Sequence, residues 1–310
     1  MEEQVGVSVD GQIVVSSLTK LYPKVRAVDG LSFTVEPGRV TGFLGPNGSG
    51  KTTTLRMILN LVTPTAGHAT IGGVRYADLV EPLASVGAVL EASSAHKGRT
   101  GRNHIRVLCA AAGYPAGRAD EVLDMVGLAA AARRKFKGYS MGMRQRLGIA
   151  TAMIGDPRVL ILDEPANGLD PEGIRWMREF LKALASQGRT VFVSSHLLSE
   201  MEQLADDVII IAAGKLIAQG KVGQIVDGVA QTGIVRVRTP HVDALTTELT
   251  RAGAVVNANG NGALEVRGVD APMVGRAALA AQAELHELVT ERPDLEQVFL
   301  ELTHGKADIR

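Results

Sequence analysis

The sequence predicts an α/β fold built on a mostly parallel β-sheet, followed by a small α+β domain. The segments 159–163 and 190–196 contain the continuous apolar stretches 159–162 and 191–193, and a helical pattern at 173–188 separates them. Strands that are apolar on both faces and alternate with helices are typical of a parallel sheet covered on both sides. From about residue 228 the composition shifts to alanine, valine, threonine and glycine, which indicates a second domain.

The first part of the chain predicts short strands, then a helix and a hairpin. Runs of β-forming residues occupy 12–22, 31–35 and 39–45. After Gly50 the apolar residues recur at helical spacing, which predicts a helix. The segment 63–73 is rich in chain breakers and predicts a turn and a hairpin.

The middle of the chain predicts a helical subdomain and a hairpin. Residues from about 92 to 157 are mostly helical in pattern, and 207–220 reads as a hairpin that turns at Gly214. We therefore expect a first domain at 1–225 and a small accessory or regulatory domain at 228–310.

The second domain shows the order strand, helix, strand, strand, helix, strand and a closing helix. This order is that of a split βαβ, ferredoxin-like unit. The segments are, in chain order, 233–239, 241–253, 254–258, 263–268, 271–282, 284–290 and 294–303.

The composition of the chain indicates which partners and which cellular compartment to expect. Lysine plus arginine and aspartate plus glutamate number 33 each, so no net charge favours nucleic acid, and no nucleic-acid partner is expected. The single cysteine, Cys109, lies in an apolar stretch and fits a core position in a reducing compartment. The N-terminus lacks the pattern of a signal peptide, and the apolar runs are far shorter than the ~20 residues that span a bilayer. We therefore expect a cytoplasmic chain.

A glycine-rich segment joins the strand predicted at 39–45 to the helix that follows. It reads GPNGSGKT and fits the spacing G-x-x-x-x-G-K-[ST] in the strand-to-helix context that this motif requires. Its glycines let successive backbone N–H groups point at phosphate oxygens. Lys51 is expected to contact the β- and γ-phosphates, and the Thr52 hydroxyl to bind Mg²⁺. The predicted nucleotide-binding residues here are Gly45, Pro46, Asn47, Gly48, Ser49, Gly50, Lys51, Thr52 and Thr53.

Two carboxylates follow the apolar strand at 159–163, in the segment VLILDEP. Asp163 is predicted to orient the Mg²⁺ shell, and Glu164 to act as general base on the attacking water. The alternative, a helix-capping acid beside a surface glutamate, does not explain why both acids follow a buried strand. His196 ends the next strand, where it could reach the γ-phosphate or the water, although a lone histidine at a strand end is usually structural.

The segments GPNGSGKTTTL, VLILDEP, NGLDP and SSH, in this order, resemble the nucleotide-binding subunit of an ATP-binding-cassette (ABC) transporter. The resemblance covers residues from about 13 to 225 and implies a P-loop NTPase fold with a helical subdomain. Within that family the chain looks like ATPase subunits of drug and antibiotic exporters, of the daunorubicin- and bacitracin-resistance type. The closing segment LEQVFLELT is similar to that group as well.

The resemblance gives a meaning to the segment YSMGM at 139–143. ABC ATPases carry a signature loop ahead of a helix, usually Leu-Ser-Gly-Gly-Gln, and two subunits pair head to tail. The resemblance implies that the Ser140 hydroxyl, the Gly142 N–H and the positive helix end contact the γ-phosphate of ATP held by a second copy. Ser140 is also a suitable N-cap, and both roles are compatible.

The chain departs from the family pattern at two places. Met141 and Met143 replace the glycine and the glutamine of the usual signature. Glu91 stands where the family places a glutamine, and we hypothesise that its carboxylate takes a metal-side role beside Thr52 and Asp163. The rival interpretation makes Glu91 a surface loop residue.

Two further residues match family positions. Tyr22 matches the aromatic residue that stacks on adenine, although a tyrosine near a strand end is also common as half-buried packing. Asp170 matches a loop that crosses to the opposite nucleotide site. The alternative is that its segment GLDP is only a turn.

The resemblance implies an ATPase that uses ATP and Mg²⁺ and drives export of a small hydrophobic or antibiotic-like compound. The implied partners are a second copy of this subunit and separate transmembrane permease subunits, which would hold the chain at the cytoplasmic face of the membrane. An importer ATPase is the alternative transporter. A non-transport ABC ATPase of ribosomes or DNA repair, and a regulator that only binds ATP, are the alternatives outside transport.

Overall fold

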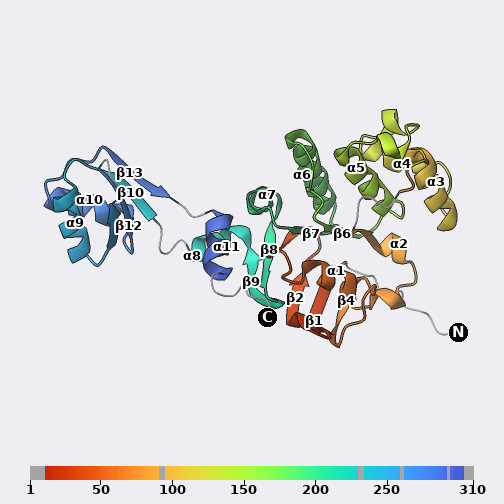
Figure 1. The fold of residues 1–310 in the computed structure, drawn as a ribbon, viewed down its shortest axis with the longest axis horizontal. Coiled ribbons are helices and arrows are strands. Elements are labelled where there is room, and N and C mark those ends of the chain that lie inside the picture. Colours follow the sequence, from red (N-terminus) through yellow and green to blue (C-terminus); the bar gives the residue numbers. More distant parts are fainter. Residues whose placement is uncertain (1–10, 91–94, 230–233, 259–261, 292–293, 304–310) are drawn as a thin grey trace. The chain divides into compact units, whose positions relative to one another are not determined.

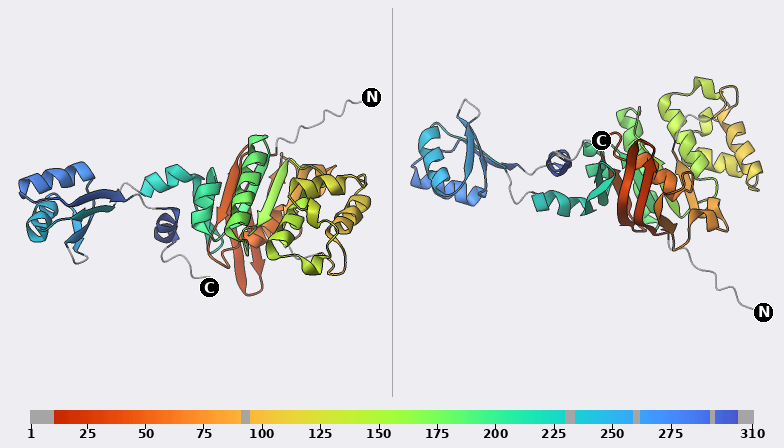
Figure 2. Two further views of the ribbon diagram at one scale, coloured as in Figure 1. Left: turned by 90° about the horizontal axis from the view of Figure 1, so that it is seen from above. Right: turned by 60° about the horizontal axis from the view of Figure 1, so that its bottom comes forward.

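The computed structural model describes residues 11–90, 95–229, 234–258, 262–291 and 294–303. These residues form two compact units. The chain up to Gly220, together with Thr303, belongs to the first, and Lys221–Leu302 to the second. Figures 1 and 2 show the elements of each unit.

The first unit contains two β-sheets. One is a six-stranded sheet of order β5-β6-β7-β3-β8-β9, and the other is a three-stranded sheet of order β2-β1-β4. The strands are β1 (Ile13–Tyr22), β2 (Val25–Val35), β3 (Val40–Leu44), β4 (Ala66–Ile71), β5 (Val86–Val89), β6 (Val159–Asp163), β7 (Thr190–Ser195), β8 (Asp207–Ala212) and β9 (Lys215–Lys221).

The centre of the larger sheet is parallel, as the sequence predicts. Strand β3 pairs in parallel with β7 and β8, and β6 pairs in parallel with β5 and β7. Every residue of β3 and β7 is buried, because helices and the second sheet cover both faces. The apolar runs that predict two-sided burial therefore form the middle of the sheet.

A large hydrophobic core lies between the two sheets, with helix α1 (Lys51–Ile58) inside it. Three aromatic rings mark its centre: Phe43 and Phe192 from the parallel sheet and Phe33 from the antiparallel sheet, with ring centroids 5.2–5.9 Å apart. Leu55 and Ile58 of α1 are buried in the same cluster. The helix that follows the phosphate loop is thus packed on its apolar face by both sheets.

Apart from α2, which contacts β5, the remaining helices of the first unit form two groups. Helices α6 and α7 contact β3, and α6 also contacts β7. Helices α3, α4 and α5 contact one another and form the region that the sequence predicts as helical (Figure 1). The bounds are α2 (Pro82–Ser85), α3 (Gly101–Ala111), α4 (Arg118–Met125), α5 (Met141–Ala152), α6 (Pro171–Ser186) and α7 (Leu198–Leu204).

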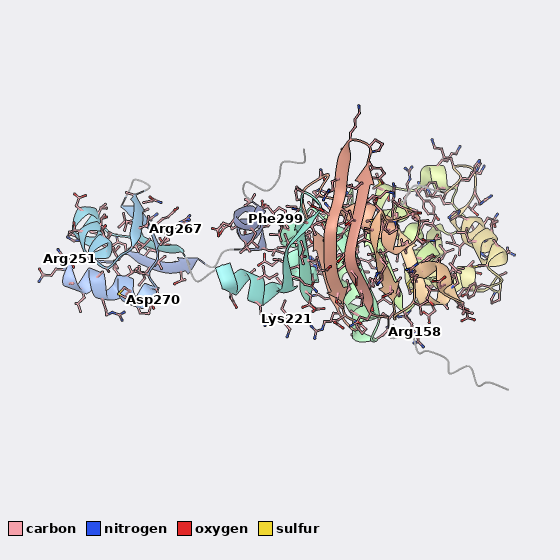
Figure 3. The ribbon with its side chains drawn as sticks, turned by 90° about the horizontal axis from the view of Figure 1, so that it is seen from below. Arg158, Lys221, Arg251, Arg267, Asp270 and Phe299 are labelled. Carbon is pink, nitrogen blue, oxygen red and sulfur yellow. The ribbon has the colours of Figure 1, made fainter. Side chains whose placement is uncertain are left out.

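The second unit has the element order and the strand order of the ferredoxin-like arrangement. Its antiparallel sheet has the order β11-β12-β10-β13, and α9 and α10 contact each other beside it. In Figure 3, Arg251 ends α9, and Asp270 caps α10 by accepting a hydrogen bond from the Met273 N–H at 2.8 Å. The bounds are α8 (Val222–Val229), β10 (Ile234–Arg238), α9 (Val242–Arg251), β11 (Val255–Ala258), β12 (Ala263–Arg267), α10 (Ala271–Ala280), β13 (Glu287–Glu291) and α11 (Leu295–Thr303).

Across the described residues, no helix combines the length and the hydrophobicity that crossing a lipid bilayer requires.

Candidate nucleotide site

The phosphate loop, Gly45–Thr52, connects the end of β3 to the start of α1. Its turn requires glycine at Gly50, which has a φ of 104° and is the N-cap of α1. A Cβ at this position would lie 2.5 Å from the Ala27 carbonyl oxygen, and a side chain would also be strained at this φ. The backbone of the loop can therefore take this course only with the residue that the motif supplies.

Lys51 lies over the loop, and its side chain is only 6% exposed. Its ammonium donates hydrogen bonds to the carbonyl oxygens of Gly45, at 2.6 Å, and Pro46, at 3.4 Å. The same nitrogen lies 3.6 Å from Glu164 Oε1. The lysine thus links the phosphate loop to the carboxylate that follows β6.

A cavity of about 240 Å³ opens at this loop. Residues from the phosphate loop, from β2 and from the end of β6 line it, which places the predicted base at the predicted phosphate site. The lining residues are Val25, Ala27, Asn47, Gly48, Ser49, Gly50, Lys51, Thr52, Thr53 and Glu164.

Thr52 and Asp163 form an oxygen pair that fits Mg²⁺. The Thr52 hydroxyl donates a hydrogen bond to Asp163 Oδ2 at 2.7 Å, so the two side chains predicted to serve one ion are adjacent. The described residues contain no group of three histidine, cysteine, aspartate or glutamate side chains that could hold a metal ion by themselves. A site of two protein oxygens suits Mg²⁺, because this ion usually takes its other ligands from phosphate and water.

Ser194 holds both acidic residues in place, and the sequence analysis did not identify it. Its hydroxyl donates a hydrogen bond to Asp163 Oδ1 and accepts one from the Glu164 N–H at 3.0 Å. The Glu164 N–H also lies 3.2 Å from the Ser194 carbonyl oxygen. Glu164 has a φ of 50°, an uncommon conformation for a residue other than glycine, and these bonds stabilise it.

His196 and Glu164 are directly paired. His196 Nδ1 lies 2.7 Å from Glu164 Oε2. A carboxylate oxygen accepts hydrogen bonds, so this geometry suits the tautomer of His196 that carries a hydrogen on Nδ1. Glu164 is therefore contacted through one oxygen by Lys51 and through the other by His196.

Ser140 and Gly142 lie at the start of α5, next to the segment that precedes α6. Ser140 is the N-cap of α5, and its hydroxyl oxygen accepts a hydrogen bond from the Met143 N–H at 3.2 Å. A Cβ on Gly168 would lie 2.7 Å from Met141 Cγ. Met141, which replaces the usual glycine of the signature, therefore packs over Gly168. Asp170 likewise caps α6, accepting from the Gly173 N–H at 2.8 Å.

Ser140, Gly142 and Asp170 are not among the described residues that line the phosphate-loop cavity. Tyr22 does not line it either, but this tyrosine is 45% exposed and pairs in the β1–β2 ladder with Val25, which does. Glu91 lies outside the described residues.

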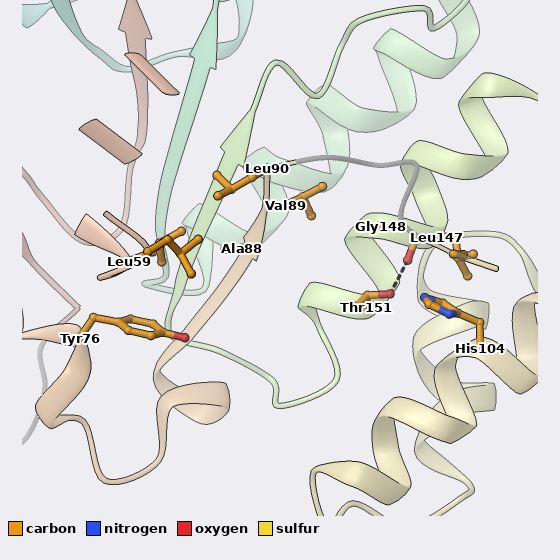
Figure 4. A pocket seen from close by; sticks show the side chains of 11 residues that line it. Leu59, Tyr76, Ala88, Val89, Leu90, His104, Leu147, Gly148 and Thr151 are labelled. Atoms are coloured by element: carbon orange, nitrogen blue, oxygen red, sulfur yellow. Dashed lines mark hydrogen bonds between the residues drawn. The ribbon is translucent and has the colours of Figure 1, made fainter. Parts of the chain in front are cut away.

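A second cavity, of about 310 Å³, shares no residue with the phosphate-loop cavity (Figure 4). Leu59, Tyr76 and Leu90 lie on one side of it, and His104 and Leu147 on the other. His104 Nδ1 is buried and has no hydrogen-bond partner among the described residues. Burial, with a smaller effect from the Arg99 charge, lowers the pKa of His104. None of the described residues that line this cavity belongs to the predicted nucleotide site.

Comparison with known proteins agrees with this geometry. A family model described as ABC transporter matches residues 28–167, and one described as a domain of unknown function matches 233–296. The bacitracin transport ATP-binding protein of Bacillus licheniformis is 43% identical, over 67% of this chain and 69% of that protein. The daunorubicin/doxorubicin resistance ATP-binding protein of Streptomyces peucetius is 34% identical, over 96% of this chain and 94% of its own length.

The solved structures agree on the fold. The dimeric structure of a bacterial ABC transporter cassette is 25% identical with a TM-score of 0.61, and the match covers 67% of this chain and 98% of that one. A relative matched over nearly its full length, a matching fold and a phosphate loop facing two carboxylates lead to one identification. The chain belongs to the ABC transporter ATP-binding proteins and is one of their ATP-hydrolysing cassettes.

Proposed function

We propose that this chain is the ATPase subunit of an ABC exporter, of the type that works with a separate membrane subunit. It would couple ATP hydrolysis to export of a small hydrophobic or antibiotic-like compound. The position of Glu164 carries the catalytic part of the proposal. This carboxylate lines the phosphate-loop cavity between Lys51 and His196.

In the proposed reaction Glu164 accepts a proton from water as the water oxygen bonds to the γ-phosphorus. The bond from that phosphorus to the bridging oxygen breaks, and ADP and inorganic phosphate leave. Loop N–H groups and Lys51 stabilise the phosphate charge, and His196 orients the Glu164 carboxylate. The protein thus contributes mainly positioning and fixed charge.

Thr52 and Asp163 would hold Mg²⁺, and Ser194 would orient Asp163 for this task. When bound, the ion supplies positive charge against the β- and γ-phosphate oxygens. Glu91 is proposed to join this pair. Replacement of Glu91 by alanine would then raise the Mg²⁺ concentration needed for half-maximal hydrolysis, and an unchanged requirement would contradict that role.

A second copy is proposed to complete the site with its own Ser140 and Gly142. Ser140 is exposed, and its bond to the Met143 N–H uses only an oxygen lone pair, so the hydroxyl hydrogen can still bond a phosphate oxygen. The existence of a dimeric relative of the same fold supports this pairing. Tyr22, next to the cavity residue Val25, is proposed to stack on adenine.

Permease subunits are proposed as partners that hold the chain at the cytoplasmic face of the membrane. The names of the relatives support export, since one concerns bacitracin transport and another daunorubicin and doxorubicin resistance. The substrate class given above rests on those names.

The proposal is tested with inside-out membrane vesicles from cells that express this chain together with a candidate permease subunit. An exporter should drive ATP-dependent uptake of fluorescent daunorubicin or labelled bacitracin into such vesicles, and the Lys51→Ala variant should not. ATP-dependent loss of a solute from preloaded vesicles would instead indicate an importer. ATP hydrolysis with no membrane partner in the purified complex would favour a non-transport ATPase.

A further inference from the structure

Two segments rich in lysine and arginine lie side by side in the helical part of the first unit. They are 96–102, which leads into α3, and 132–137, which precedes the signature. Backbone hydrogen bonds join them, among them Phe136 N–H to the Arg99 oxygen at 2.9 Å and Lys137 N–H to the Lys97 oxygen at 3.0 Å. Thr100 and Lys135 form an isolated antiparallel bridge between the same segments.

This pairing gathers six cationic side chains, which we call the basic strip. Five are exposed and Arg99 is half-buried. None of the six forms a salt bridge or a side-chain hydrogen bond with a residue that the structure describes. Arg102 is not a member, because Asp120 neutralises it at 2.5 Å. The members are Lys97, Arg99, Arg133, Arg134, Lys135 and Lys137.

The balanced charge of the whole chain conceals this local excess. Between Ala95 and Ala152 there are eleven arginine and lysine residues and three acidic ones, whereas the full chain has 33 of each sign. The segments 95–107 and 132–139 contain no aspartate or glutamate. The basic strip is therefore one-signed, unlike an ordinary solvated surface, on which both signs are mixed.

The strip stands on an ordered base. Phe136, between two members of the strip, is 3% exposed, and its ring centroid lies 5.9 Å from that of Tyr139. The Tyr139 hydroxyl donates a hydrogen bond to the Ala131 carbonyl oxygen at 2.9 Å. The Arg144 guanidinium lies over the Phe136 ring, 5.2 Å from its centroid. The backbone carrying the cations is thus fixed by packing, while their side chains extend outward.

We propose that the basic strip binds anionic phospholipid headgroups. These belong to the membrane in which the permease lies, because the permease would hold this chain beside that membrane. The inference rests on the proposed function for that location. A one-signed cluster of four to eight exposed lysine and arginine residues is suited to an anionic lipid surface. Protein interfaces are in contrast depleted in lysine, which supplies three of the six members, and enriched in exposed aromatic residues, whereas Phe136 and Tyr139 are buried beneath the strip.

The test is co-sedimentation of the purified, nucleotide-free full chain with phospholipid vesicles. One set of vesicles is phosphatidylcholine alone, and the other contains phosphatidylglycerol at increasing fractions. The wild-type chain should bind only the anionic vesicles. Binding should fall as salt rises from 50 to 300 mM, because salt screens the attraction between exposed charges. Because no ATP is present, a failure here is distinct from a failure of the proposed ATPase or export activity.

The triple variant Arg133→Glu, Lys135→Glu, Lys137→Glu should lose at least about tenfold in vesicle affinity. The matched control reverses three exposed cations of the same unit outside the strip, Arg75→Glu, Arg175→Glu and Lys182→Glu, and should keep most of the affinity. A glutamine version of the strip variant removes charge without adding repulsion and should show an intermediate loss. Thermal melting of each variant confirms that it is folded.

Three results would overturn the proposal. One is equal binding to neutral and anionic vesicles. Another is an equal loss of affinity in the strip and control variants, which would show a response to net charge alone. The third is tighter binding to single-stranded RNA, or to an acidic segment of the permease, than to anionic vesicles, since the strip would then serve a different class of partner.

Discussion

Ser194 and Asp163 lie opposite each other in the parallel register of β7 and β6, and the Ser194 hydroxyl donates to Asp163 Oδ1. The same hydroxyl accepts from the Glu164 N–H. One buried side chain therefore contacts the proposed metal-binding carboxylate and the backbone of the proposed base. Ser194 is a positioning residue in this arrangement, because it acts through Asp163 and Glu164.

Replacing Ser194 with alanine should raise the Mg²⁺ concentration at half-maximal ATP hydrolysis by about tenfold, since a hydrogen bond to a charged group contributes ~1.5–3 kcal/mol. The value of kcat should fall as well, while nucleotide binding without metal should change little. The measurement is phosphate release against Mg²⁺ concentration. Thr41→Val is the control, because Thr41 has a buried hydroxyl in the same sheet and this hydroxyl has no hydrogen-bond partner in the part of the chain that the structure describes. Equal shifts in both variants would reduce Ser194 to a packing role.

Glu164→Gln should bind ATP with near-normal affinity and hydrolyse it at least about 10²-fold more slowly, the usual contribution of a general base. Glutamine keeps the size of the side chain and can still accept from His196, but it cannot take a proton from water. Binding of a fluorescent ATP analogue and phosphate release measure the two effects. Normal turnover would remove the base assignment.

A mixing experiment tests whether two copies share each site. Lys51→Ala and Ser140→Arg dimers should each be inactive, because every site then contains one defect. In a mixed dimer one site carries both defects and the other carries neither, so combining the two variants should restore part of the activity. Absence of any restored phosphate release, with mixed dimers shown by dual-tag purification, would contradict the shared site.

Cys109 should react slowly with a thiol reagent in the folded chain. It is fully buried in α3, and burial raises the pKa of its thiol, so little thiolate forms at pH 8. The rate of labelling should rise steeply in urea, as α3 opens, and it should vanish in Cys109→Ala. Rapid stoichiometric labelling of the native chain would show that α3 is not packed as described.

Local pattern was sufficient for much of the fold. The strand predicted at 159–163 is β6 with the same limits, and the hairpin predicted at 207–220 turns at Gly214 between β8 and β9. Both segments are dense in residues of one structural preference and are bounded by turn residues, so their structure is decided within a short window. Ser140 as the N-cap of α5 follows in the same way.

Contacts between distant segments could not be predicted in this way. Ser194 reads as an ordinary strand residue, and it meets Asp163 only because β6 and β7 pair in a particular register. The packing of Met141 over Gly168 depends on how the start of α5 meets the loop before α6. The basic strip likewise arises from backbone pairing of two segments that are about thirty residues apart.

Helix α1 begins at the phosphate loop and continues into the main core, where Leu55 and Ile58 are buried beside the three phenylalanine rings. Defects in this interior should therefore reach the loop: a cavity made at Phe33, which does not itself line the phosphate-loop cavity, would lower both the melting temperature and the affinity for ATP. The converse follows from the same linkage, because a ligand that binds only the folded loop protects the whole core against heat. In this cassette, thermal stability and affinity for the nucleotide are therefore linked, and a change in one should be accompanied by a change in the other.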